Sequence, residues 1–178
     1  SGLTVAATLE IAEYRGRDRH VLRYKRDAPA FSHVVMHELA KLDFITRARK
    51  AGANKLFTTQ AEHRQIFLQD IKGDLRRLQS RGFSASQAEA YADSVFHGLA
   101  LQIYSAPVDL FIEDYLYDEH PELRPVQFLS LIRIHSTGVG AVTDKEVRQH
   151  APKSVLEAST VYNLTQAYHL ADRFGVDL

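Results

Sequence analysis

The stretch that decides the fold is a run that carries two histidines, a glutamate and a lysine, His33-Val34-Val35-Met36-His37-Glu38-Leu39-Ala40-Lys41. Apolar residues around it recur at helical spacing and predict a helix from about residue 29 to residue 50. On this helix His33, His37 and Lys41 lie along one stripe, because each is four residues from the next, with neighbours about 6 Å apart. Two imidazoles at this spacing can bind one metal ion, and Glu38, roughly 100° around the helix, can act on a metal-bound water.

The segment before this helix has the two-residue period of β-strands. Residues 20–25 alternate between apolar and polar types, and so does an earlier run whose apolar members are Leu3, Val5, Ala7, Leu9 and Ile11. The polar run 15–19 between them is typical of a turn, so residues 1–26 are predicted to form a β-hairpin. Pro29 ends the hairpin, because proline cannot donate to a strand ladder.

Beyond the first helix the apolar residues keep a helical period to the end of the chain. Glycine, proline and capping residues divide this part into a series of expected helices, 58–80, 84–104, 107–120, 125–135, a short one that starts at 143 and is interrupted by Pro152, and 154–174. The run Thr137-Gly138-Val139-Gly140 is expected to be a loop.

The predicted fold class is therefore α+β, a mostly helical domain with a small N-terminal β-hairpin. We expect a single domain over residues 1–178, made of the hairpin (1–26), the motif helix and the acidic helices (29–120), and a C-terminal helical cap (121–178). The start, Ser1-Gly2-Leu3, lacks both Met and a basic leader, and it suggests a domain excised from a longer protein.

Composition limits the chemistry that is open to this chain. It has 178 residues, with 22 Lys and Arg against 22 Asp and Glu, nine His and no Cys. The lack of Cys excludes disulfides, thiolate metal sites and cysteine nucleophiles, so a metal site must use His, carboxylate and water. A neutral chain has no global reason to bind nucleic acid or an anionic membrane, and its apolar runs are shorter than the roughly 20 residues of a membrane span. We expect no nucleic-acid partner, no membrane partner and a cytoplasmic location.

The charges are neutral only in total. Residues 41–81 carry ten basic side chains against four acidic ones, and residues 103–122 carry six acidic side chains and no Lys or Arg. One interpretation is that these are two solvated faces that attract each other. The other is that the acidic segment supplies ligands, because Asp109 and Glu113 share one helical face and Asp114 lies beside them.

The motif helix and its surroundings resemble the zincin metallopeptidases, whose signature is H-E-x-x-H. The resemblance lies in His37-Glu38 on an apolar helix after a hairpin and a proline, followed by a later acidic helix. It implies that His37 binds zinc, that Glu38 is the general base and that Glu113 is the third ligand, as in the gluzincin branch. Asp109 or Asp114 would then hold a ligating histidine from behind.

The sequence departs from this family at Lys41, which stands where the second signature histidine belongs. A protonated ammonium has no lone pair to offer a metal. Three interpretations stay open. His33 can replace the missing ligand, which places Glu38 after the second ligand rather than between the two. Alternatively, Lys41 can pair with Glu38 or Glu113 in an inactive relative, or the resemblance is accidental.

The expected function is therefore that of a zinc-dependent metallopeptidase, a hydrolase that cleaves peptide bonds with metal-activated water. The alternative is a catalytically inactive pseudoprotease that binds a peptide or protein partner, because Lys41 replaces a ligand. The chain has no G-x-G-x-x-G or G-x-x-x-x-G-K motif for nucleotides and no G-x-S-x-G motif for serine hydrolases.

Overall fold

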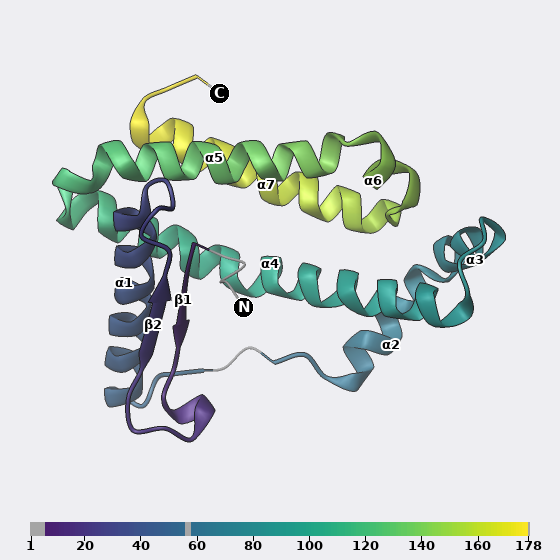
Figure 1. Cartoon of the computed structure of the whole chain (residues 1–178), viewed down its shortest axis with the longest axis horizontal. Coiled ribbons are helices and arrows are strands. Elements are labelled where there is room, and N and C mark those ends of the chain that lie inside the picture. The colour runs from purple at the N-terminus through teal and green to yellow at the C-terminus, as the bar shows by residue number, and fades with distance from the viewer. Residues whose placement is uncertain (1–5, 56–57, 178) are drawn as a thin grey trace. The chain divides into compact units, whose positions relative to one another are not determined.

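The computed structural model describes residues 6–55 and 58–177, and it confirms a mostly helical α+β fold. A small two-stranded sheet lies at the N-terminal end and helices make up most of the rest (Figure 1). In chain order the elements are β1 (Ala7–Glu10), η1 (Glu13–Arg15), β2 (Val21–Tyr24), α1 (Phe31–Lys50), α2 (Ala61–Asp70), α3 (Lys72–Ser80), α4 (Ala85–Glu119), η2 (Pro121–Leu123), α5 (Arg124–Thr143), α6 (Lys145–His150) and α7 (Lys153–Phe174).

Contacts along the chain form two compact units. The first unit comprises Ser1–Leu56 and Asp109–Ile134, and the second comprises Phe57–Val108 and His135–Leu178. The helices α4 and α5 each begin in one unit and end in the other. The expectation of one domain over residues 1–178 stays a prediction.

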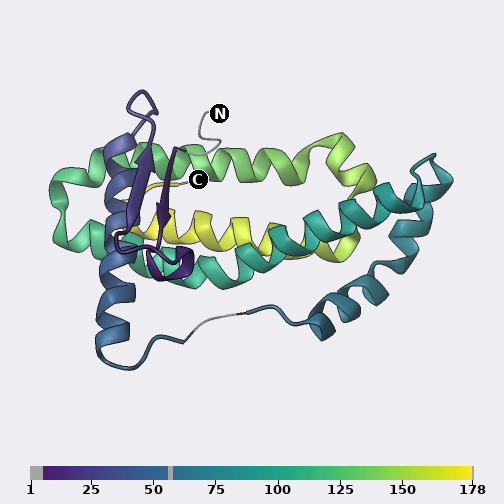
Figure 2. The same ribbon diagram turned by 60° about the horizontal axis from the view of Figure 1, so that its bottom comes forward.

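The predicted hairpin is confirmed for the residues that the structure describes. Strands β1 and β2 pair antiparallel, with Ala7 opposite Tyr24 and Glu10 opposite Val21. Both views show the pair beside α1, and contacts join α1 to both strands (Figures 1 and 2). Burial of Ala7 anchors this packing. The expected early positions Leu3 and Val5 lie outside the described residues.

The core of the first unit fixes α1 against the last third of α4. Ala40 of α1 packs with Ile112 and Leu116 of α4, and the two α4 side chains are completely buried. Phe44 and Tyr115 meet edge to face at 5.2 Å between ring centres, an arrangement that aromatic pairs favour. Because Ile112 and Leu116 face α1, the residue between them in sequence, Glu113, is held close to the same helix.

The second unit is built on contacts between α2 and the start of α4. Phe67 and Phe96 lie 5.4 Å apart between ring centres, and Arg64 donates to Asp93 at 2.7 Å. The expected helix 58–80 is wrong in detail, because it is two helices, α2 and α3, that meet at Ile71. Gln60 and His63 form the capping box at the start of α2.

The expected break between helices 84–104 and 107–120 is wrong as well. A single 35-residue helix, α4, runs through Pro107. Proline removes one helical hydrogen bond at a cost of about 3 kcal/mol. Burial of Ala88 and Ala92 before it and of Ile112 and Leu116 after it offsets that cost, since each end is packed within its own unit.

This length changes one expectation drawn from the apolar runs. In the described part of the chain, α4 alone is long and apolar enough to cross a membrane by length and composition. Its most apolar window has a mean hydropathy of 1.3 and is 11 % buried. A single such helix is weak evidence of a span, because the test considers length and composition only.

The expected loop at 137–140 is helical, because α5 continues to Thr143. Gly138 lies so close to the Asn163 side chain of α7 that a Cβ atom at this position would collide with it. The glycine therefore marks a close approach of two helices rather than a turn. The expected helices at the end of the chain are confirmed, and the Asp144 side chain caps α6 by accepting from the Val147 amide.

Two glycines of α5 give a matched test of this close approach. We expect Gly138→Ala to destabilise the protein by about 1–3 kcal/mol, because the new methyl group meets the buried Asn163 side chain. Gly140→Ala, with open space around it, should instead stabilise the helix by up to about 1 kcal/mol. Urea unfolding measures both free energies. Equal changes in the two variants would contradict the packing at Gly138.

Candidate metal centre

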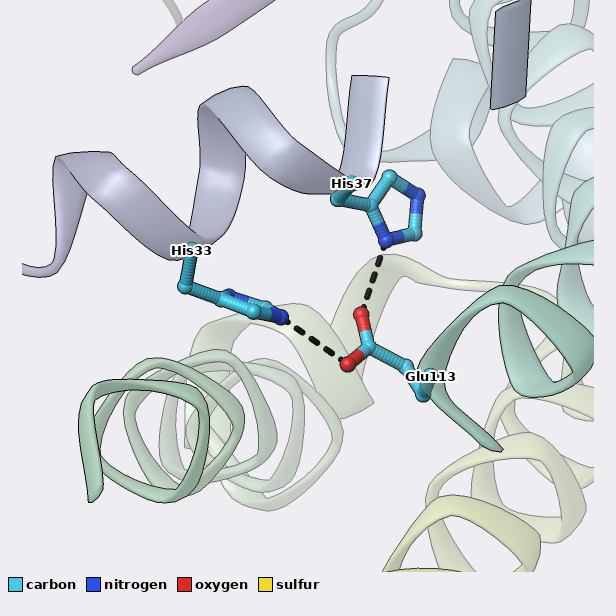
Figure 3. Close-up of side chains that lie close together, drawn as sticks. All are labelled: His33, His37 and Glu113. Atoms are coloured by element: carbon cyan, nitrogen blue, oxygen red, sulfur yellow. Dashed lines mark hydrogen bonds and ion pairs between the residues drawn. The ribbon is translucent and has the colours of Figure 1, made fainter. Parts of the chain in front are cut away.

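Two pairs of side chains, one on α1 and one on α4, face each other in the first unit. His33 and His37 are one turn apart on α1, and Asp109 and Glu113 are one turn apart on α4. Both imidazoles point at the Glu113 carboxylate (Figure 3). His33 Nε2 donates to Oε2 at 2.9 Å, and His37 Nδ1 donates to Oε1 at 2.8 Å. Each oxygen of the Glu113 carboxylate thus accepts a hydrogen bond from one of the two histidines.

The cluster is removed from water to different degrees at its two ends. His33 and Glu113 are 2 % and 5 % exposed, whereas His37 is half-buried. His37 also lies between two carboxylates, because its Nε2 is 3.4 Å from Asp109 Oδ1. The predicted placement of Asp109 behind a ligand-type histidine is therefore present in the structure.

Burial and pairing act in opposite directions on the ionisable groups. Burial alone would lower the pKa of His37, but its hydrogen bonds to Asp109 and Glu113 raise that pKa to about 9. Burial alone would raise the pKa of Glu113, but the bonds from His33 and His37 lower it to about 2. The metal-free centre therefore holds a positive imidazole between carboxylates at neutral pH.

Gln127 is a part of the centre that the sequence did not single out. It lies on α5, is 1 % exposed and donates its side-chain amide to the Glu113 carbonyl at 2.9 Å and to Oε2 at 2.7 Å. A signal was present, since Gln127 is the one amide in the largely apolar run Val126–Ile132. A lone amide among apolar residues on a helix indicates a buried polar partner.

The other residues that the sequence singled out, Glu38, Lys41 and Asp114, do not belong to the group formed by His33, His37 and Glu113. Lys41 donates to Glu38 Oε1 at 3.2 Å, so of the two partners considered for Lys41, Glu38 and Glu113, it contacts Glu38. In the described contacts Glu38 is joined to Lys41 and not to His33 or His37. Asp114, half-buried, follows Glu113 in the chain but is not part of the three-residue ligand group.

The chemistry of the three donors fits a zinc ion. One donor atom from each of His33, His37 and Glu113 lies within 4.8 Å of the other two, and zinc binds imidazole nitrogen and carboxylate oxygen. The N–H protons that now join these groups must leave before a metal can take their place. The present distances of 2.8 and 2.9 Å are shorter than the roughly 3.4 Å between ligand atoms of a tetrahedral zinc, so zinc binding would require the donor atoms to move apart by about 0.5 Å.

Two of the three candidate ligands contact a further polar side chain outside the ligand group. Asp109 faces the far nitrogen of His37, and Gln127 holds Glu113. Such outer partners orient ligands and tune the metal. Within the described residues, Nδ1 of His33 is buried without a hydrogen-bond partner. Metal binding through Nε2 would place a proton on that atom, so His33 is the weakest member of the set.

Comparisons with protein-family models, with curated proteins and with solved structures found no match. The resemblance to the zincins therefore stays a prediction from the motif.

The opposing pKa shifts predict a bell-shaped dependence of stability on pH for the metal-free protein. The pKa of Glu113 falls from 4.5 to about 2 on folding, so its contribution is present above pH 4.5 and is lost as the pH falls towards 2. The pKa of His37 rises from 6.5 to about 9, so its contribution is complete below pH 6.5 and is lost as the pH rises towards 9. Urea unfolding across this range, with chelator present, should show a maximum between these limits. Glu113→Gln should flatten both sides, and an unchanged profile in that variant would contradict the assignment.

Proposed function

We propose that the first unit binds zinc through His33, His37 and Glu113 and that the chain is a metallopeptidase-like hydrolase of peptide bonds. The observation that carries this proposal is the convergence of three zinc-type donors from α1 and α4 at a largely buried position. The outer partners Asp109 and Gln127 support it, because they stand where ligand-orienting groups stand in metal sites. A peptide or protein substrate and a cytoplasmic location are parts of the same proposal.

The chain's own residues divide the work as follows. When bound, zinc supplies a water of pKa near 7 and polarises a carbonyl group. Asp109 accepts the outer proton of His37 and so fixes its tautomer. Gln127 holds one oxygen of Glu113. Glu38 is the proposed base, and the Lys41 ammonium contacts one of its two carboxylate oxygens, Oε1.

A second candidate function is favoured by that same contact. The ammonium of Lys41 lies against Glu38. The residue at the second signature position and the proposed base therefore form one ion pair. A domain of this kind would bind a peptide or protein partner without cleaving it. This alternative keeps the three-residue cluster but removes the catalytic step.

Zinc content tests the centre itself. We expect the purified protein to bind about one zinc, and His37→Ala to weaken binding by more than about 100-fold, because one of three ligands is lost. His97→Ala is the control, since His97 is an exposed residue of α4 whose ring contacts the Asp93 carbonyl. Titration calorimetry and elemental analysis give affinity and stoichiometry. A protein that takes up no zinc, or that loses it equally in the control, would exclude the proposal.

Peptide cleavage separates the two candidate functions. If Glu38 is the base, Glu38→Gln should retain zinc and reduce cleavage of a fluorogenic peptide library by roughly 100-fold or more. Lys41→Ala, which leaves the Glu38 carboxylate without its ammonium, should not reduce cleavage. If the zinc-loaded wild-type protein binds labelled peptides but cleaves none, the pseudoprotease is the better description.

A further inference from the structure

Gln127 makes two hydrogen bonds to one residue. Its amide nitrogen lies 2.9 Å from the backbone carbonyl of Glu113 and 2.7 Å from the side-chain Oε2. An amide NH₂ group has two protons, so one can be donated to each acceptor. A donor that is hydrogen-bonded to both the main-chain carbonyl and the carboxylate of one residue restricts the rotation of that residue's side chain. Gln127 therefore limits how the Glu113 carboxylate can turn.

The two oxygens of Glu113 are consequently not equivalent. Oε2 accepts hydrogen bonds from Gln127 and His33, whereas Oε1 accepts one from His37. Oε2 is thus occupied by two donors and Oε1 by one. The oxygen with spare capacity, Oε1, faces the half-buried side of the cluster, where His37 lies.

The amide of Gln127 carries a cost that packing does not explain. Within the described residues its Oε1 atom is buried and has no hydrogen-bond partner. A buried acceptor without a partner lowers stability, and an apolar side chain of similar length would fill the same space without that cost. A neutral donor also holds Glu113 without adding a cation that would compete with a metal. An amide kept at this position is better explained by its action on Glu113 than by packing.

We propose that Gln127 is the positioning residue of the centre, which holds Oε2 of Glu113 so that Oε1 is the oxygen presented to a metal. This inference rests on the proposed zinc centre. Outer groups of this kind change metal affinity by 10–100-fold in known sites. Gln127 acts through Glu113 and is not itself a ligand.

The test compares Gln127→Met, which keeps the length but removes the donor, with Ser130→Ala, a buried control on the same helix. Zinc affinity is measured by competition with a chromophoric chelator, and the ligand field by the visible spectrum of the cobalt(II) form. We expect Gln127→Met to bind zinc about 10–100-fold more weakly with an altered cobalt spectrum, whereas Ser130→Ala keeps both. A purely structural role would change the unfolding midpoint and leave affinity and spectrum as in wild type.

A second variant covers the case in which Gln127→Met does not fold. Gln127→Ala removes the donor without placing a longer side chain beside Glu113, and it should also weaken zinc binding and alter the spectrum. If the wild-type protein binds neither zinc nor cobalt, the proposed function is overturned. If the wild type binds and the folded Gln127 variants bind equally tightly with the same spectrum, the inference about Gln127 alone is overturned.

Discussion

The first unit depends on one buried carboxylate with three donors. Glu113, at 5 % exposure, accepts hydrogen bonds from His33 and His37 of α1 and from Gln127 of α5. A charge at this depth is strongly unfavourable unless it is paired and hydrogen-bonded, so each donor is needed where it stands. The carboxylate therefore joins α1, α4 and α5, and the completely buried side chains of Ile112 and Leu116 pack in the apolar core on the same helix.

The same carboxylates can stabilise either a protonated histidine or a bound cation. Asp109 and Glu113 stabilise a protonated His37 in the metal-free protein, and they would equally stabilise a divalent cation that replaces its proton. In the metal-free centre, hydrogen bonds already satisfy both oxygens of Glu113. The same contacts would orient the donors of the proposed site before an ion binds.

Local spacing allowed prediction of part of this centre. The four-residue intervals between His33 and His37 and between Asp109 and Glu113 place each pair on one helical face, and the structure brings the pairs together. Gln127 was missed because its role depends on how α5 packs against Glu113, and spacing within one helix does not predict that packing. The continuation of α4 through Pro107 and of α5 through Gly138 was missed for a related reason. Local signals for a break were opposed by packing at both ends of α4 and, in α5, by the approach of Gly138 to Asn163.

The candidate ligand pair, His33 and His37, lies one helical turn before the pair that the zincin signature would use, because Lys41 stands at the second signature position. In the zincin signature the ligands would be residues 37 and 41 with Glu38 between them along the axis, whereas the cluster uses His33 and His37 and leaves Glu38 beyond the second ligand. Metal binding and catalysis would therefore depend on different residues. Three donors with two outer partners support binding, and none of them depends on Glu38 or Lys41. The proposed hydrolysis rests instead on Glu38, whose Oε1 lies 3.2 Å from the Lys41 ammonium. The two proposed functions therefore differ at this ion pair and share the cluster.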